Sequence, residues 1–281
     1  MALRRPNTYK RYSCETAAAP ARAVRKILQR VGMHPEDTET IDVDLAGRRA
    51  LVIATNHGTL DVGKPTGVFS SELTVPYYAF LDAGMTVDVA SPNGGVIPVD
   101  PQSLKPVVRT EDCDRFLADA ELKERVNDSL PVGTLDMADY DIVYLAGGWG
   151  AAFDLGMSDE LGRQITIANE HDRVIGGVCH GPLGLLKAKD KDGSPLVEGR
   201  RLTAVTDKQV HELGIDSTPQ HAETELRKLG ADFESETRFR DPFANHWVVD
   251  GNLVTGQNQN AAPMVAREML ALVAQRQAGH L

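Results

Sequence analysis

The chain of 281 residues is 42% hydrophobic and 25% charged, the balance of an ordinary globular protein with room for a substantial core. Its formal net charge of −10 argues against nucleic-acid binding as the main task, and no stretch approaches the roughly 20 apolar residues of a membrane span. We therefore expect neither a nucleic-acid nor a membrane partner. The three cysteines are far apart and lack the spacing of a zinc site, so we expect a reducing, cytoplasmic location.

The N-terminal part differs in composition from the rest of the chain. Eight basic residues stand against a single acid, Glu15, before residue 31. Residues 1–16 predict an extended arm, and residues 17–31 predict a helix with an apolar face. We interpret the arm as a solvated segment that packs on the acidic body, with a transit peptide as the alternative. The chain is therefore divided into an N-terminal arm and helix, 1–46, and an α/β domain, 47–281.

Apolar strands alternate with amphipathic helices through the second part. In chain order the pattern predicts a strand over 50–55, a helix over 71–83, a strand over 86–90, a helix over 111–127, a strand over 140–146, a helix over 158–170, strands over 174–178 and 202–205, a helix over 218–229, a hairpin of 246–249 with 252–255, and a helix over 261–275. This alternation predicts an α/β fold with a mostly parallel central sheet and helices on both faces. Ligands of such sheets gather at the carboxyl ends of the strands.

A long segment near 92–110 interrupts the alternation. It holds four prolines and two glycines and has no clear helix or strand pattern. Because it is too long for a plain connection, we predict a functional lid or an inserted surface loop.

The strand over 174–178 runs directly into a tight turn that carries Cys179 and His180 side by side. Glycines on both sides of this pair allow a sharp bend, and Pro182 suits the first turn of a following helix. A cysteine at such a junction is expected to be exposed at a helix N-terminus, whose partial positive charge favours the thiolate. Cys179 is therefore the predicted nucleophile, and the alternative is a small buried hydrophobic residue.

Other chemical side chains follow the ends of other predicted strands. Glu72, at a predicted helix start, is expected to stay protonated and to donate to the Cys179 thiolate; the alternative is a first-turn acid that favours the helix dipole. His180 is the predicted general base, and Asp207, after the next strand, is the predicted carboxylate that orients it. The alternatives are a capping or core histidine and an N-capping aspartate.

A glycine-rich turn, 147–150, follows the strand over 140–146. Gly147 and Gly148 are candidate backbone N–H donors to an oxyanion, a role compatible with a turn required by geometry alone, and Trp149 is a candidate wall of the pocket. The remaining histidines are scattered without a partner at short spacing, and no phosphate-binding loop follows a strand. We therefore expect neither a metal nor a cofactor.

Three motifs together resemble the ThiJ/PfpI superfamily: the strand and GGxG turn over 145–150, the Cys-His elbow over 178–182, and the Ser-Glu pair at 71–72. The chain length, the insertion near 92–110 and the Thr-Asp-Lys sequence at 206–208 look like the larger branch. That branch contains the glutathione-independent glyoxalases, also called glyoxalase III, and a heat-shock holding chaperone that shares their site.

The resemblance implies a flavodoxin-like three-layer sandwich that is usually a homodimer. It places the nucleophile at Cys179, the neighbouring histidine at His180, the acidic partner at Asp207 and the protonated glutamate at Glu72. The metal site of the chaperone branch has no counterpart after Glu72, and Trp149 replaces a residue that is often histidine.

The resemblance further implies an enzyme that acts on a small-molecule carbonyl substrate. It would convert methylglyoxal-type 2-oxoaldehydes into 2-hydroxy acids such as D-lactate. The Cys179 thiolate would form a hemithioacetal, and His180 and Glu72 would move protons between the two carbons. The alternatives are a cysteine hydrolase of C–N bonds, a holding chaperone or stress protein that shares the fold, and a redox sensor.

Overall fold

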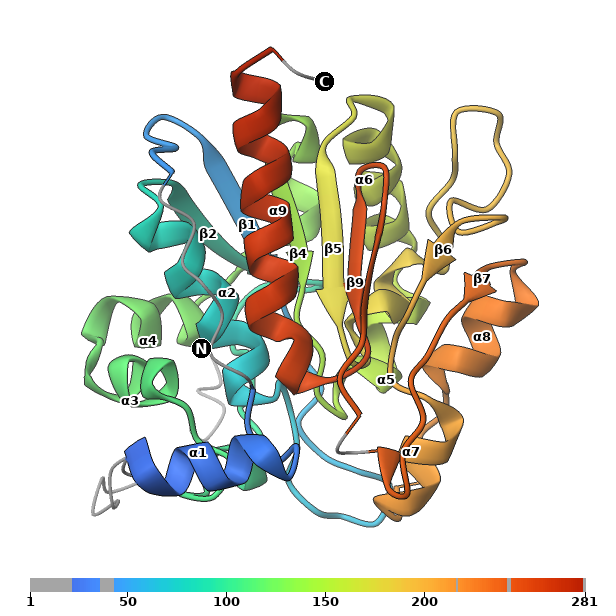
Figure 1. Cartoon of the computed structure of the whole chain (residues 1–281). Helices are drawn as coiled ribbons and strands as arrows, with labels where there is room; N and C mark the ends of the chain where they lie inside the picture. The colour runs from blue at the N-terminus through green and yellow to red at the C-terminus, as the bar shows by residue number, and fades with distance from the viewer. Residues whose placement is uncertain (1–21, 36–42, 216, 242–243, 280–281) are drawn as a thin grey trace, which may run out of the picture.

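A computed structural model describes the chain over residues 22–35, 43–215, 217–241 and 244–279. The predicted arm over 1–16 and the start of the predicted helix over 17–31 lie outside the described residues. Helix α1 (Arg22–Arg30) confirms the remainder of that helix. The described residues form three layers, with a sheet between two layers of helices (Figure 1), so the predicted sandwich is confirmed.

The central layer is a seven-stranded sheet with the strand order β3-β2-β1-β4-β5-β9-β8. Its strands are β1 (Arg49–Ile53), β2 (Thr86–Ser91), β3 (Leu130–Pro131), β4 (Ile142–Leu145), β5 (Val174–Val178), β8 (Trp247–Asp250) and β9 (Leu253–Gly256). All neighbouring strands run parallel except β8 and β9, which form the predicted antiparallel hairpin. The predicted mostly parallel sheet is therefore confirmed.

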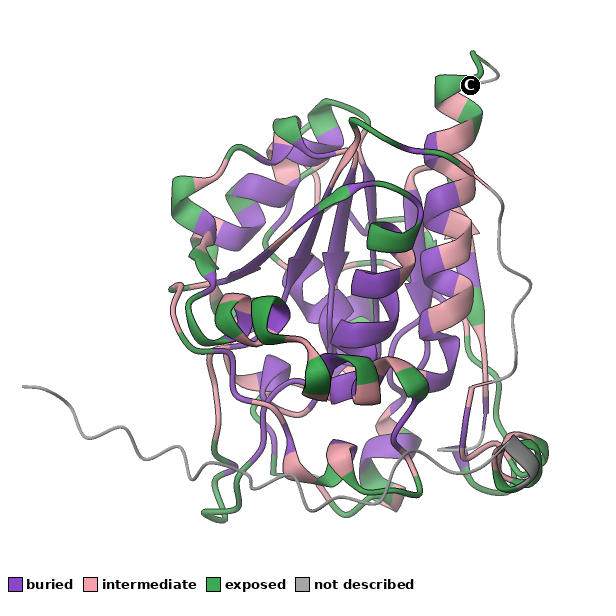
Figure 2. Cartoon of the chain, turned by 90° about the vertical axis from the view of Figure 1, so that its left-hand side faces the viewer, coloured by how far each residue is buried: buried purple, intermediate pink, exposed green. Residues whose placement is uncertain are grey.

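Helices cover both faces of this sheet, which explains the continuous apolar runs of its central strands. Helices α2 (Ser70–Asp82) and α9 (Ala262–Gln277) pack side by side on one face, and α6 (Asp159–Glu170) lies on the other (Figure 1). Every residue of β4 and β5 is buried, and the central strands of the sheet are correspondingly purple in Figure 2. Ser158 caps α6, because its hydroxyl accepts from the Leu161 N–H at 3.1 Å.

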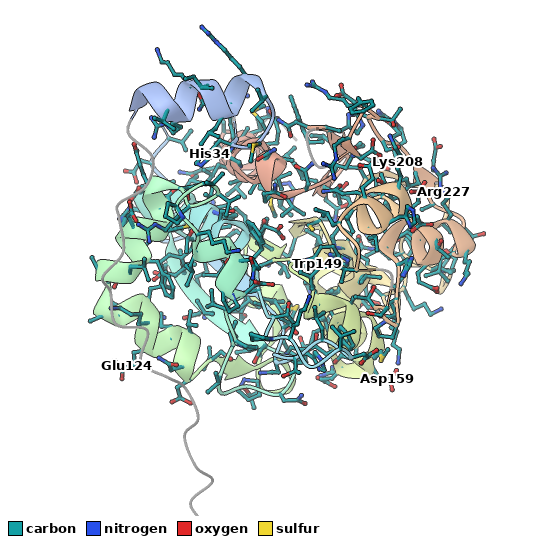
Figure 3. The ribbon with its side chains drawn as sticks, turned by 90° about the horizontal axis from the view of Figure 1, so that it is seen from below. His34, Glu124, Trp149, Asp159, Lys208 and Arg227 are labelled. Carbon is teal, nitrogen blue, oxygen red and sulfur yellow. The ribbon has the colours of Figure 1, made fainter. Side chains whose placement is uncertain are left out.

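The strand order reverses beside β1, since β2 lies on one side of it and β4 on the other. At such a switch point the loops after the two strands diverge and leave room for a ligand. The register pairs Leu145 of β4 with Gly177 of β5. The glycine turn after β4 and the cysteine turn after β5 therefore lie side by side, and Trp149 lies near the centre of this end of the molecule (Figure 3).

The predicted helix over 111–127 is two helices. Helix α3 (Glu111–Ala118) ends and α4 (Ala120–Asn127) begins at Asp119, whose backbone is extended. The Asp119 carboxylate accepts from the Leu122 N–H at 3.0 Å and from the Tyr78 hydroxyl at 2.9 Å. An N-capping side chain inside a helical pattern thus breaks the helix, because it satisfies the N–H groups of a new first turn.

The strand predicted over 202–205 does not belong to the central sheet, so this part of the prediction is wrong. The short strand β6 (Arg201–Leu202) pairs only with β7 (Asp232–Phe233), in a separate two-stranded sheet. The helix predicted over 218–229 covers fewer residues in the structure than expected, and a helix that the sequence pattern did not predict precedes it. These helices are α7 (Asp207–Glu212) and α8 (Ala222–Lys228).

The segment near 92–110 is anchored to the body of the domain. The Val68 N–H donates to the Pro98 carbonyl at 2.8 Å, and the Asp100 N–H donates to the Val68 carbonyl at 2.9 Å. The buried Asp100 carboxylate accepts from the Thr66 hydroxyl at 2.9 Å. These bonds favour the inserted loop among the two predicted interpretations, since a lid needs few such attachments.

Several short helical pieces connect the longer elements of the described residues. They are the α-helix α5 (Ala151–Asp154) and 3₁₀ helices at Pro101–Leu104, Val132–Thr134, Met137–Asp139, Leu155–Met157, Gly181–Leu185 and Gln259–Ala261. Among the residues described, none of the helices combines the length and apolar character that a bilayer span requires.

Candidate active site

The turn after β5 holds Cys179 in a strained backbone conformation. Its φ of 58° lies in the left-handed region, which residues other than glycine seldom adopt. The Cys179 N–H donates to the Gly256 carbonyl of β9 at 3.0 Å, and the Cys179 carbonyl accepts from the Val205 N–H at 3.0 Å. Two neighbouring segments therefore fix the bend, and the predicted tight turn is confirmed.

Gly181 stands where a side chain cannot fit. A Cβ at this position would overlap the carbonyl oxygen of Leu145, which the sheet holds in place. We expect Gly181→Ala to lower the free energy of unfolding by at least about 2 kcal/mol, because neither backbone can move without disturbing the β4–β5 pair. Urea unfolding measures this loss.

The control for this prediction is Gly133→Ala. A Cβ at Gly133 would meet only the flexible side chain of Glu160, at 3.3 Å from its Cγ. This variant is expected to stay close to the parent stability, and equal losses for the two variants would contradict the steric argument.

The structure corrects the expected exposure and ionisation of the cysteine. The turn leads into the 3₁₀ helix Gly181–Leu185 instead of an α-helix, and Cys179 is only 9% exposed. Burial, and next the negative charge of Glu72, raise the pKa of the thiol well above its ordinary value. A single 3₁₀ turn has too few aligned peptide dipoles to offset that burial. Cys179 of the free protein is therefore a buried thiol and not the exposed thiolate that the sequence predicts.

Glu72 lies in the first turn of α2 and is 1% exposed. Burial raises the pKa of its carboxyl to about 8; the Cys179 thiol and the Gly147 N–H, which face the carboxyl, oppose this rise, and the charge of Asp100 adds to it. At neutral pH Glu72 is thus mostly protonated, as predicted, but the predicted donation to a Cys179 thiolate is wrong for the free protein, because Cys179 is itself a protonated thiol. Because the carboxyl and the thiol interact directly, they lose their protons as one coupled pair.

Backbone N–H groups surround this pair. The N–H groups of Gly148 and His180 face the Cys179 sulfur and favour its charged form. A Cβ at Gly147 would lie 2.7 Å from the Val178 carbonyl oxygen and 2.8 Å from the His180 nitrogen, so only glycine permits this approach. The predicted donors from the glycine turn thus point at the thiol and the carboxyl, and their oxyanion role stays a prediction.

His180 contacts the thiol directly. Its Nδ1 lies 3.4 Å from the Cys179 sulfur, and burial lowers the pKa of the imidazole to about 3, so the ring is neutral. Its Nε2 is buried without a hydrogen-bond partner among the described residues. The Trp149 ring lies 4.9 Å from the imidazole, tilted by 57°, and is half-buried. Trp149 therefore packs against His180, and its role as a wall of a substrate pocket stays a prediction.

Asp207 is not bonded to His180 in the described part of the chain. Thr206 caps α7 by accepting from the Gln209 N–H at 3.0 Å, so Asp207 falls in the first helical turn. Its carboxylate accepts from the Thr224 hydroxyl and lies 3.9 Å from His221 Nδ1. The predicted direct pair of Asp207 with His180 is thus replaced by a contact with His221.

Sequence reasoning missed three groups near the site. Asp100 adds its negative charge to the surroundings of Glu72, and His221 lies close enough to His180 to oppose its protonation. The charges of Glu72 and Cys179 act on the buried hydroxyl of Tyr144. Only Tyr144 leaves a signal in the sequence, since it is the one polar side chain within an apolar strand and stands near its carboxyl end.

No three histidines, cysteines or carboxylates group closely enough to hold a metal ion within the ranges that the structure describes. The chemistry that remains is that of a thiol with an acid and a neutral base beside it, which suits addition to a carbonyl carbon followed by proton transfer.

Residues 64–272 match the DJ-1/PfpI family. The chain belongs to this family. The matched range contains the cysteine turn, Glu72 and Asp207, and it starts after α1.

Two curated members of the DJ-1/PfpI family show how far the similarity extends. Glyoxalase 3 of Candida albicans is 30% identical over 213 residues, which are 74% of this chain and 90% of that protein. The glutathione-independent glyoxalase hsp3101 of Schizosaccharomyces pombe is 29% identical over 233 residues, 78% of this chain and 93% of that protein.

The crystal structure of glyoxalase III from Candida albicans has the same fold as this DJ-1/PfpI protein. The two superpose with a TM-score of 0.72 at 26% identity, over 80% of this chain and 96% of the other. The similarity therefore extends over most of the chain and is not confined to the cysteine turn.

Proposed function

We propose that this DJ-1/PfpI protein is a glutathione-independent glyoxalase that converts 2-oxoaldehydes such as methylglyoxal into 2-hydroxy acids. The observation that carries the proposal is the buried pair of Glu72 and Cys179, with the neutral His180 at 3.4 Å from the sulfur. Two relatives that cover most of the chain and are named as glyoxalases support it. A cysteine that adds to the substrate takes the place of glutathione.

The first step joins the sulfur to the aldehyde carbon. When the Glu72–Cys179 pair has lost one proton, Glu72 takes the thiol proton while the sulfur attacks. Glu72 then passes this proton to the aldehyde oxygen, which gives a hemithioacetal and leaves Glu72 ionised again. The N–H groups of Gly148 and His180 already face the sulfur and favour its negative charge. Covalent addition thus divides one difficult rearrangement into easier steps.

The second step moves a proton between the two substrate carbons. The neutral imidazole of His180 accepts the proton from the former aldehyde carbon, and an enediol forms. Return of a proton to the neighbouring carbon leaves a thioester of the 2-hydroxy acid on Cys179. Water then cleaves the thioester, so that the net reaction adds one water to the 2-oxoaldehyde and restores the thiol.

The direct test is methylglyoxal consumption by the purified protein without added glutathione. We expect stoichiometric formation of lactate and no hydrolysis of simple amides or peptides. Amide or peptide hydrolysis without lactate would contradict the proposal and favour the hydrolase alternative.

The pH dependence follows from the shared proton. Since burial raises the pKa of Glu72 to about 8, one proton must leave the pair before the thiol can attack. We expect kcat/KM for methylglyoxal to rise about tenfold per pH unit below this value and to level off above it. Rates measured from pH 5.5 to 9.5 check this, and a profile that is flat or falls over this range would contradict the coupled pair.

We also propose that the protein works in the cytoplasm. The mechanism needs a reduced thiol, and both described cysteines, Cys113 and Cys179, are free. Imaging of the protein with a C-terminal fluorescent fusion tests the location, and a signal confined to an organelle would contradict it.

A further inference from the structure

The Tyr144 hydroxyl is a buried polar group that the proposed mechanism does not use. Tyr144 is fully buried in β4, and its hydroxyl has no hydrogen-bond partner within the described residues. The hydroxyls of Tyr78 and Tyr140, which are also buried tyrosines, bond to Asp119 and Asp88 at 2.9 and 3.0 Å. A buried hydroxyl without a partner is unfavourable, because it has lost its bonds to water. The position of Tyr144 therefore calls for a functional explanation.

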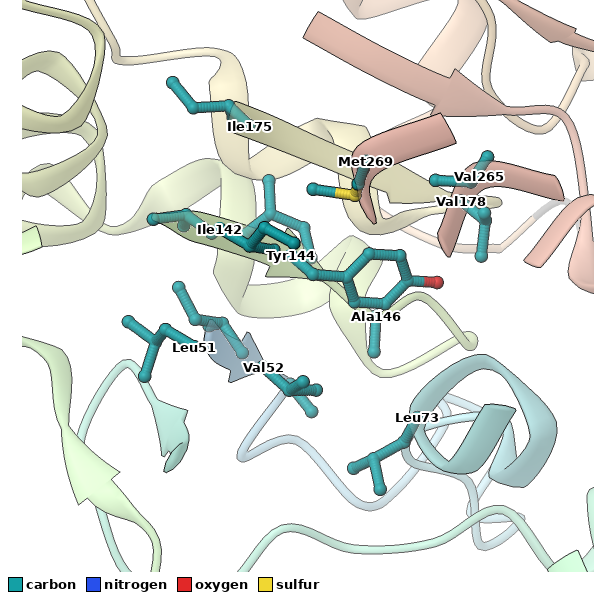
Figure 4. Close-up of a cluster of buried hydrophobic side chains, with 14 of the residues drawn as sticks. Leu51, Val52, Leu73, Ile142, Tyr144, Ala146, Ile175, Val178, Val265 and Met269 are labelled. Carbon is teal, nitrogen blue, oxygen red and sulfur yellow. The ribbon is translucent and has the colours of Figure 1, made fainter. Parts of the chain in front are cut away.

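The tyrosine side chain reaches toward the thiol and the carboxyl. Its ring lies in the buried cluster that includes Val178, the residue before Cys179, and Leu73, the residue after Glu72 (Figure 4). The charges of Glu72 and Cys179 both act on the hydroxyl. The Oε2 atom of Glu72 is itself buried without a hydrogen-bond partner among the described residues. Two unpartnered polar atoms thus belong to neighbouring groups in the same dry region.

We propose that Tyr144 is a positioning residue for Glu72, whose hydroxyl donates a hydrogen bond to the Glu72 carboxylate once the Glu72–Cys179 pair has lost a proton. This bond would give a partner to the two buried oxygens that lack one among the described residues. The proposal deepens the proposed function, and its catalytic meaning rests on that function.

The charges around Glu72 explain why such a donor matters. The titratable groups that act on the carboxyl are Cys179 from the turn after β5 and Asp100 from the inserted loop, and Tyr144 approaches from β4. Cys179 shares the negative charge of the pair, and the negative charge of Asp100 makes ionisation of Glu72 less favourable. The tyrosine is a neutral side-chain donor that can stabilise the ionised pair, since it does not compete for the charge. Without it the pair should hold its proton to a higher pH.

The test follows the alkylation of Cys179 by iodoacetamide as a function of pH, with the modified residue identified by mass spectrometry. This reaction reports the ionised pair directly and does not depend on methylglyoxal turnover. We expect a midpoint near pH 8 in the parent protein, where burial places the pKa of Glu72. Tyr144→Phe should move the midpoint up by about one pH unit, and the pH profile of kcat/KM should move with it.

The matched control is Tyr140→Phe, which removes the hydroxyl of a buried tyrosine bonded to Asp88 and should leave the midpoint unchanged. Replacement of Tyr144 by 3-fluorotyrosine keeps the ring and strengthens the donor, so it should move the midpoint down. No shift in either Tyr144 variant, or equal shifts in the Tyr140 control, would overturn the proposal. A shift in alkylation in a protein without glyoxalase activity would support Tyr144 and refute only the proposed function.

Discussion

Replacing Cys179 with alanine is expected to lower kcat/KM for methylglyoxal by at least about 10⁴-fold. The reason is that every later step needs the covalent bond between the sulfur and the substrate. The other described thiol, Cys113, contacts Ser70 and Thr74, which lie on the face of α2 opposite Glu72. The measurement is lactate formation at pH 8, where the coupled pair of Glu72 and Cys179 is half ionised. Unfolding by urea should show a folded variant, because alanine fits the space of a cysteine.

Cys113→Ala is the matched control for this variant. Cys113 is buried and free, and it accepts from the hydroxyls of Ser70 and Thr110 at 3.2 Å each. This variant should keep most of its activity. Methylglyoxal turnover that survives in Cys179→Ala would refute the nucleophile. If that variant also suppressed aggregation of an unfolded client protein, the holding-chaperone alternative would be favoured.

Replacing Glu72 with glutamine is expected to lower kcat/KM by about 10²–10⁴-fold, the usual contribution of a general acid or base. The amide has nearly the same shape as the carboxyl but cannot accept the thiol proton. The levelling off of activity near pH 8 should also disappear, because the variant lacks the group whose pKa burial raises to about 8 and keeps only the thiol, whose pKa lies well above its ordinary value. Steady-state rates across this pH range measure both effects.

The same substitution should make the protein more stable at neutral pH. Folding raises the pKa of Glu72 from its ordinary 4.5 to about 8, so the folded state binds a proton that the unfolded chain has released. Between these values the stability of the parent therefore falls as pH rises, by up to about 3 kcal/mol at pH 7. The glutamine variant does not titrate and avoids this loss.

Urea unfolding at pH 4.5 and pH 7 distinguishes the two effects of the Glu72 substitution. The difference in unfolding free energy between Glu72→Gln and the parent should be larger at pH 7 than at pH 4.5. A variant that is inactive and less stable at both pH values would indicate a structural role for Glu72 in place of the proposed proton transfer.

Local patterns in the sequence determined the sheet and the cysteine turn. Strands buried on both faces must be apolar throughout, so β1, β4 and β5 could be read directly from their composition. The bend at Cys179 was equally predictable. A backbone that turns this tightly after β5 and passes close to β4 needs glycine at positions such as 181. Both features depend on residues that are neighbours along the chain.

Weak or competing local signals explain the errors in the fold. The helical pattern over 111–127 did not reveal that Asp119 caps a new helix, because an aspartate in a helix and at a cap differ only in backbone conformation. The strand over 202–205 was too short to show whether it joins the central sheet or pairs with β7. In both cases packing against distant segments decided between local alternatives of similar free energy.

The chemistry of the site was decided by the tertiary structure alone. The sequence named Cys179, Glu72 and His180 but predicted an exposed thiolate, whereas burial leaves the thiol protonated and coupled to Glu72. The sequence also predicted a contact between Asp207 and His180, whereas in the structure Asp207 lies in the first turn of α7 and contacts His221. Protonation depends on how much water and charge surround a group, and those surroundings come from segments far apart in the chain, which is why no local pattern could fix them.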